Sequence, residues 1–231
     1  MTHPKHRPAT DAAFAVDERN RAKRLHERAK YDRAAVHAVL DASPLCHVAY
    51  VVDGQPYVTP TLHWRVGDRV YWHGSSASRF LKKAQGAPVC LTVSLLDGYV
   101  LARSAFHHSV NYRSAMVFGT AQLVEGREAS EAALRHMMES LYPGRWDALR
   151  PVTDQELKAT RVLYLDIEAA SMKDRDGPPS DEPEDLTHPV WAGVIPVRAS
   201  LGAAEPDAHT PESLAVPEGL AALIASGKLR P

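Results

Sequence analysis

The residues best suited to chemistry lie in one short stretch that combines serines, an arginine and lysines. It spans residues 71–83 and reads YWHGSSASRFLKK. The pattern predicts a strand that ends at His73, a Gly/Ser turn, and a helix whose first turn offers hydroxyls, backbone N–H groups and the guanidinium of Arg79. Such a helix end attracts anions, and a guanidinium matches phosphate oxygens two at a time. The stretch could therefore form a phosphate site. The alternative is a serine-capped helix with Arg79 in solvent.

Two other stretches carry side chains that could line a ligand pocket. Residues 109–114 (SVNYRS) place hydrogen-bonding groups, an aromatic ring and a cation at the start of a predicted strand. They could form the rim of a binding site or an ordinary polar turn. Residues 59–63 (TPTLH) form a strand restricted by proline, which could offer backbone groups to a flat polar ring.

Other chemistries find little support in the sequence. The chain has 12 histidines, but no H-x-x-x-H pair or C-x-x-C motif, so we expect no metal site. A G-x-S-x-G nucleophile motif is absent as well. Cys46 and Cys90 lie in apolar runs typical of strands and are expected to be buried free thiols. Among the histidines, His73 stands out only because it precedes the serine-rich turn.

The composition is that of an ordinary globular protein. The 231 residues are 45% hydrophobic and 24% charged, with a formal net charge of −1. No apolar run approaches the roughly 18 residues of a membrane span, and the N-terminus lacks the apolar core of a secretory signal. We therefore expect a cytoplasmic protein. The basic arm at residues 19–28 leaves a DNA-associated regulator as a minor alternative, but the modest net charge does not favour binding to nucleic acid.

The predicted elements belong to a mainly β protein of the α+β class. A helix capped by Asp32 buries Val36, Val39 and Leu40, and another helix covers residues 128–141. Turn signals at Asp53-Gly54 and Asp97-Gly98 predict two hairpins. Expected strands cover residues 45–52, 55–65, 69–73, 89–96, 99–105, 115–124 and 163–168. Six or seven antiparallel strands with few helices fit a closed barrel better than a parallel sheet. No G-x-G-x-x-G motif supports a dinucleotide-binding α/β fold.

Three segments are expected along the chain. Residues 1–27 form a flexible N-terminal arm, residues 28–197 form the barrel domain, and residues 198–231 form a loosely attached C-terminal extension. The acidic, proline-rich residues 174–185 are expected to be an exposed loop.

The order of several short motifs resembles a known family. The motifs are LCHVAY at 45–50, DG at 53–54, YVTP at 57–60, YWHG at 71–74, SR at 78–79, SVNYRS at 109–114, FG at 118–119 and WAGVIP at 191–196. Together they resemble the flavin-binding split barrels of the pyridoxamine 5'-phosphate oxidase-like family. The likeness is closer to the branch of nitroimidazole-resistance and flavin-nucleotide-binding proteins. The fold so implied is a six- to seven-stranded antiparallel split β-barrel with flanking helices.

The resemblance implies a homodimer that binds FMN at the subunit interface. The phosphate would be held by Ser78 and Arg79, with Ser75, Ser76 and Lys82 nearby, and the flavin ring would lie against residues 59–62, near His73. Some pocket residues would come from the partner subunit. The implied cofactor-binding residues are Thr59, Pro60, Thr61, Leu62, His73, Gly74, Ser75, Ser76, Ser78, Arg79, Lys82, Asn111, Tyr112, Arg113 and Trp191.

The expected function is that of an FMN-dependent oxidoreductase acting on an unidentified small molecule. His73 is the candidate catalytic residue, as a proton donor or a group that orients the substrate. The alternatives are a non-catalytic flavin- or haem-binding protein and a deazaflavin-dependent reductase. The motif that marks true pyridoxamine phosphate oxidases is not evident, so we do not expect a role in vitamin B6 synthesis. The sequence names neither the substrate nor the electron donor.

Overall fold

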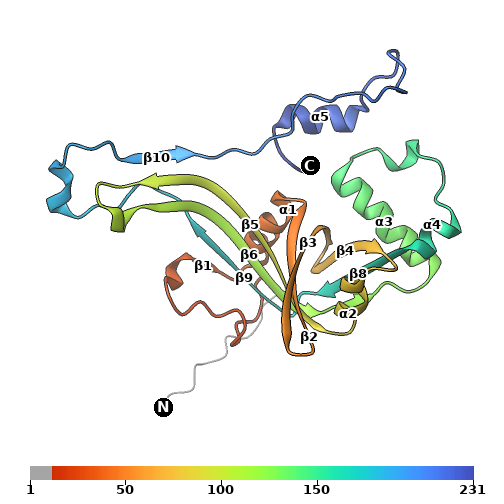
Figure 1. Ribbon diagram of the computed structural model, residues 1–231, viewed down its shortest axis with the longest axis horizontal. Coiled ribbons are helices and arrows are strands. Elements are labelled where there is room, and N and C mark those ends of the chain that lie inside the picture. The colour runs from red at the N-terminus through yellow and green to blue at the C-terminus, as the bar shows by residue number, and fades with distance from the viewer. Residues whose placement is uncertain (1–11) are drawn as a thin grey trace.

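The computed structural model describes residues 12–231, which form one curved antiparallel sheet with helices packed around it (Figure 1). Nine of the ten strands in these residues join in the order β1-β9-β6-β5-β2-β3-β4-β8-β7, and the tenth, β10, pairs with β5. The strands are β1 (Ala29–Lys30), β2 (Leu45–Val52), β3 (Gln55–Val66), β4 (Arg69–Ser75), β5 (Pro88–Leu101), β6 (Ser109–Thr120), β7 (Gln122–Leu123), β8 (Thr160–Asp166), β9 (Ala169–Arg175) and β10 (Gly193–Pro196).

Three of the five helices in residues 12–231 begin at a residue whose side chain caps the helix. The Asp32 side chain accepts a hydrogen bond from the Ala35 N–H, and Thr153 and Glu156 form a complete capping box. The helices are α1 (Arg33–Ala42), α2 (Arg79–Ala84), α3 (Arg127–Leu141), α4 (Asp154–Ala159) and α5 (Glu218–Ser226). Short 3₁₀ turns are η1 (His26–Arg28), η2 (Ala105–His107), η3 (Trp146–Ala148) and η4 (Pro183–Thr187).

The core lies inside the curved sheet, and it is formed by the alternate residues of each strand whose side chains point inward. Along β2, Cys46, Val48, Tyr50 and Val52 are buried, while the residues between them are more exposed. They pack with inward residues of β4, β5, β6 and β8 and with the apolar face of α1. A smaller cluster, centred on Trp64, lies between the outside of the sheet and α3.

The barrel is open between β3 and β4. These strands pair only from His63 to Val66, so the first part of β3 pairs with β2 alone, while β4 continues alongside β8. Pro56 and Pro60 lack the N–H donors that a second neighbouring strand would require. The fold class, a split barrel, is confirmed. The closed barrel expected from the strand pattern alone was wrong.

The predicted turn at Asp97-Gly98 was also wrong. β5 continues through these residues with a bulge between Leu96 and Gly98, and the chain reverses only at η2. Two long-range partners hold this part of the strand: Arg113 of β6 binds the Asp97 carboxylate, and β10 pairs with residues 98–101. Consequently, residues 109–114 belong to β6, which begins six residues before the strand expected at residues 115–124. Figure 1 shows the resulting arm, made of β5, β6 and β10, extending from the barrel.

More strands are present than the six or seven predicted because several carry weak sequence signals. β1 and β7 have two residues each and β10 has four, whereas β9 ends in the charged sequence Lys-Asp-Arg. No helix within residues 12–231 is both long and apolar enough to cross a membrane.

Both terminal segments make contacts with the barrel. Phe14 and Val16 are buried near the N-terminus, and Leu223 is buried on α5. At the C-terminus the Arg230 guanidinium donates hydrogen bonds of 3.3 Å to the carbonyls of Leu40 and Ser43. The division at residues 27 and 197 stays a prediction, and the first eleven residues of the expected arm lie outside the described part of the chain.

Candidate functional site

The serine-rich turn joins β4 to α2 as the sequence predicts. Ser78 caps α2, its hydroxyl accepting from the Leu81 N–H at 3.5 Å, and the Ser75 hydroxyl accepts from the Ala77 N–H at 3.2 Å. Ser76 donates its own N–H to the Ala159 carbonyl at 2.7 Å. Because α2 has only six residues, its dipole contributes little. Any anion at this turn would therefore depend mainly on cationic side chains.

Three exposed cations lie on α2, of which Arg79 and Lys82 were predicted to bind the phosphate. The side chains of Arg79 and Lys82 are exposed, and the ion pairs found among residues 12–231 include neither of them. The Arg79 guanidinium lies 5.5 Å from the centroid of the Tyr57 ring on β3. This contact brings the predicted phosphate turn next to the strand predicted to carry the flavin ring.

The facing part of β3 is amphipathic. Thr59 and Thr61 are half-buried, whereas Pro60 and Leu62 are exposed on the opposite face. The Thr59 hydroxyl lies 3.5 Å from that of Tyr50, within hydrogen-bond distance. The structure thus brings residues 57–62 and 73–82 to the two sides of the opening in the barrel.

Three aromatic rings, which the sequence analysis did not select, support this opening. Tyr50 stacks on Tyr57 at 5.5 Å and contacts the Phe80 ring at 5.1 Å. The rings fix α2 against the β2–β3 hairpin. Side chains alternate between the two faces along β2 and β3, and this alternation could have indicated that Tyr50 and Tyr57 share a face. The sequence offers no sign that Phe80 contacts them.

His73 faces away from the barrel core. Trp72 points inward, so His73 lies on the outer face of β4, where its ring is 5.9 Å from that of Trp64. The Nδ1 atom is buried and has no hydrogen-bond partner within the described residues. Burial lowers the pKa of this imidazole, which favours the neutral form at neutral pH.

The remaining predicted residues lie on the arm. Asn111 is buried and donates to the Gly177 carbonyl at 3.1 Å, while Arg113 forms two hydrogen bonds of 2.7 and 2.9 Å with Asp97. Trp191 is 62% exposed, just before β10, and Tyr112 lies on β6 between Asn111 and Arg113.

The arm residues and the α2 turn are far apart within one chain. Only the C-terminal end of β6 lies near α2: Gly86, just after α2, donates its N–H at 2.7 Å to the carbonyl of Ala121, just after β6. Asn111 is nine residues from Thr120, the last residue of β6, a distance of about 30 Å along an extended strand. A single chain therefore does not bring all the predicted site residues together.

The other histidines are less suited to a ligand site. His63 is completely buried, and its Nε2 lies 2.9 Å from the Leu40 carbonyl oxygen. Burial, followed by the nearby charge of Arg230, lowers the pKa of His63 to about 4. His47 is exposed on the outside of β2, and His107 and His108 lie at the tip of the arm. Within residues 12–231, no group of three or more His, Cys, Asp or Glu side chains could hold a metal ion.

Comparisons with known proteins agree with the fold. The family model described as pyridoxamine 5'-phosphate oxidase matches residues 32–174. The structure of the flavocytochrome Anf3 from Azotobacter vinelandii is 47% identical, with a TM-score of 0.85, covering 90% of this chain and 97% of that one. An FAD and heme binding protein from Mycobacterium smegmatis is 36% identical, with a TM-score of 0.83, covering 88% of this chain and all of that one.

A third structure shares the fold at lower identity. It is described as a 5-nitroimidazole antibiotic resistance protein from Bacteroides thetaiotaomicron and is 22% identical, with a TM-score of 0.51, covering 63% of this chain and 85% of that one. No curated protein matches the chain. The family model covers more than half of the sequence, and the first two structures are aligned over nearly their whole length. The chain belongs to the pyridoxamine 5'-phosphate oxidase family.

Proposed function

We propose that this protein binds a flavin nucleotide at the opening of the barrel and acts as an oxidoreductase. The observation that carries the proposal is the contact between Arg79 and Tyr57, because it places a cation with no carboxylate partner in the described chain beside the edge of β3. The family relationship and the flavocytochrome and FAD-binding relatives support the same cofactor class.

The residues at the opening fit the two ends of a flavin nucleotide. Arg79 and Lys82 would hold phosphate oxygens, since guanidinium and ammonium groups bind phosphate and both side chains reach solvent. The edge of β3 at residues 59–62 has no strand partner opposite β2 in the described chain, so it can present backbone groups to the ring. The flavin would supply hydride or electron transfer, while the chain binds and orients it.

The form of the flavin is a separate question. The sequence analysis expects FMN, whereas the Mycobacterium smegmatis relative is described as binding FAD. Since that relative aligns with nearly the whole chain, we propose FAD as the preferred form, with FMN sharing the same phosphate contacts. Mass spectrometry of the cofactor released from the purified protein distinguishes the two forms by their masses.

We further propose that a second copy of the chain completes the site. Asn111 and Trp191 could join the opening only from another subunit, given the length of the arm. The outside of the β2–β3–β5–β6 sheet also carries exposed apolar residues that a partner could cover. They are Leu45, Val51, Val58, Leu62 and Met116, and we call this set the outer sheet patch.

The first test is the visible spectrum of the protein after incubation with FAD or FMN and then dialysis. Retained flavin bands, with about one flavin per chain, support the proposal. A protein that remains colourless with both flavins contradicts it. Oxidation of NADH or NADPH with candidate acceptors then separates an oxidoreductase from a flavin carrier.

Haem binding is a second candidate function, favoured by the state of His73. Neutral imidazole is the form that ligates iron, and burial keeps His73 in that form. Its Nδ1 is buried, but its Nε2 is not enclosed and makes no hydrogen bond within the described chain, whereas the Nε2 of His63 is already bonded to Leu40. Two relatives aligned over nearly the whole chain are described as a flavocytochrome and as an FAD and heme binding protein. We therefore propose His73 as the residue that would hold haem iron.

Haem titration of two variants tests this assignment. His73→Ala should remove the haem absorption band, whereas His47→Ala, which changes an exposed histidine on β2, should retain it. Loss of the band in His47→Ala alone would instead place the iron on the outer sheet patch. Circular dichroism shows whether either variant is folded.

A further inference from the structure

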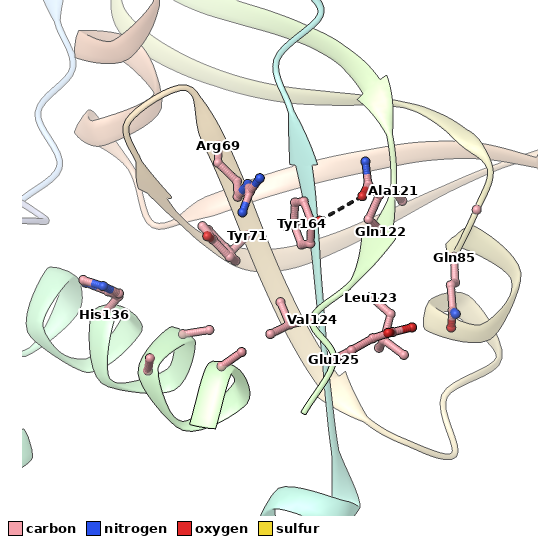
Figure 2. A pocket seen from close by; sticks show the side chains of 14 residues that line it. Arg69, Tyr71, Gln85, Ala121, Gln122, Leu123, Val124, Glu125, His136 and Tyr164 are labelled. Atoms are coloured by element: carbon pink, nitrogen blue, oxygen red, sulfur yellow. Dashed lines mark hydrogen bonds between the residues drawn. The ribbon is translucent and has the colours of Figure 1, made fainter. Parts of the chain in front are cut away.

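A cavity of about 720 Å³ lies on the other side of the barrel wall, between α3 and the outer faces of β4, β7 and β8. Figure 2 shows Tyr71 on the helix side of β4, the Tyr164 hydroxyl directed toward Gln122, and Arg69 at one end. None of the residues proposed to bind the flavin lines it. Its volume lies within the range of small-molecule sites.

The cavity exists because of what α3 presents to the sheet. The helix faces it with Ala129, Ala132, Ala133 and His136, spaced as neighbours on one helical face. Alanine side chains are too short to fill the space between a helix and a sheet, which larger apolar residues usually occupy. The Trp64 cluster next to it is filled in this way.

The strand side of the cavity is a fixed aromatic wall. Tyr71 and Tyr164 are directly opposite each other on β4 and β8, with ring centroids 5.8 Å apart. On the side of Tyr71 away from Tyr164, the ring of Trp64 on β3 stacks on it at 5.5 Å and only 9° from parallel. Because Trp64 already holds this tyrosine in place, a flat ring could contact the wall with little loss of side-chain entropy.

Arg69 holds the other tyrosine in place. Its guanidinium lies 4.1 Å from the centre of the Tyr164 ring, and two of its nitrogens bind Asp166 at 2.7 and 3.2 Å. The third nitrogen, Nη1, makes neither of these bonds. Its donors lie at this end of the cavity, where the Tyr71 hydroxyl is also close enough to interact with the guanidinium.

Hydrogen-bond donors predominate along the polar rim. The Gln122 Oε1 accepts from the Tyr164 hydroxyl at 2.8 Å, and the Gln85 Oε1 accepts from Arg161 at 2.6 Å. Each amide keeps its NH₂ donors for a further partner. Glu125 is the one carboxylate among the residues that line this cavity.

We propose that this cavity is a binding site for a flat aromatic molecule carrying carboxylate or carbonyl oxygens. The ring stacks on Tyr71 and Tyr164 opposite the alanines of α3, and its oxygens accept hydrogen bonds from Arg69, Gln122 or Gln85. The site stands on its own geometry and does not require the proposed flavin site.

Calorimetric titration of the full-length protein with 2-naphthoate tests the proposal. One molecule should bind per chain. Ala132→Leu should weaken binding by about tenfold or more, because the longer side chain fills the cavity. Glu128→Leu places the same side chain on α3 outside the cavity lining and should leave the affinity unchanged. Thermal melts establish that both variants are folded.

A second ligand tests the polarity of the rim. 2-Naphthylmethylammonium has the same ring system but carries a cationic donor in place of the acceptor oxygens, so it should bind at least about tenfold more weakly. The proposal is overturned if 2-naphthoate does not bind, if Ala132→Leu binds it as well as the unchanged protein, or if the two ligands bind equally. None of these outcomes depends on whether flavin is bound.

Discussion

The guanidinium of Arg79 lies 5.5 Å from the centre of the Tyr57 ring, and this contact joins two distant segments of the chain. One is the serine-rich turn after β4, and the other is the part of β3 that leaves the barrel. Stacking of Tyr57 on Tyr50 fixes the ring beneath the arginine. The cation is thus held at the opening of the barrel while remaining exposed to a ligand.

Arg79→Ala should lower flavin affinity by about tenfold or more without unfolding the protein. The loss follows from removing a charge-assisted contact to phosphate. Folding should persist because the side chain is exposed and α2 keeps its Ser78 cap. Lys83→Ala, an exposed change on the same helix, is the matched control. Flavin titration by fluorescence quenching measures both, and unchanged affinity in Arg79→Ala would remove this residue from the site.

His63 should make the folded state less stable in mildly acidic solution. The pKa is about 4 in the folded protein, against 6.5 for an ordinary histidine, so the unfolded chain binds this proton more readily. The free energy of unfolding should therefore fall as the pH is lowered from about 6.5 to about 4. The contribution of His63 is of the order of 3 kcal/mol.

Urea unfolding of the His63→Gln variant measures how much His63 contributes to the loss of stability at low pH. The amide can still donate to the Leu40 carbonyl but cannot titrate. Between pH 7 and pH 4.5 the variant should lose less stability than the unchanged protein. Equal losses would show that other groups, such as His73, account for the acid sensitivity.

Arg230 tests how firmly the C-terminal extension is attached. The residue is 5% exposed, and burial lowers the pKa of its guanidinium, which nevertheless bonds to the carbonyls of Leu40 and Ser43. Arg230→Ala should lower the free energy of unfolding by about 1–3 kcal/mol, because both acceptors lose a buried charged donor. Lys228→Ala, an exposed change nearby, is the control. Equal unfolding midpoints in both variants would support the loosely attached extension expected from the sequence.

The sequence predicted the structure correctly in segments whose conformation is determined by residues next to one another in the chain. Asp53-Gly54 forms the expected tight turn, with positive φ at both residues. The same dipeptide at Asp97-Gly98 does not, because Arg113 and β10 extend the strand past it. No local pattern reveals those partners, since they come from residues further along the chain. This explains why the barrel was predicted but the arm was not.

The candidate site likewise has some features that local sequence predicts and others that depend on distant residues. The strand, turn and capped helix around Ser78 follow from local sequence. Three features depend on tertiary structure: the contact of Arg79 with Tyr57, the lack of a partner for the His73 Nδ1 within residues 12–231, and the distance from the opening to Asn111. The motif order grouped these residues in one site, but within one chain Asn111 lies far from the opening of the barrel.

Val58 belongs to the outer sheet patch, and a substitution there tests the proposed dimer. Its side chain is 62% exposed, and Val58→Asp would place a charge where a partner surface should cover apolar groups. We expect the unchanged protein to sediment as a dimer and the variant as a folded monomer with weakened flavin binding. Leu214→Asp, a change at a similarly exposed site on the C-terminal segment, should remain dimeric. The proposal is contradicted if the monomeric variant binds one flavin per chain as tightly as the unchanged protein does. In that case the arm residues of a partner are not required, and the flavin site consists of β3 and the β4–α2 turn alone.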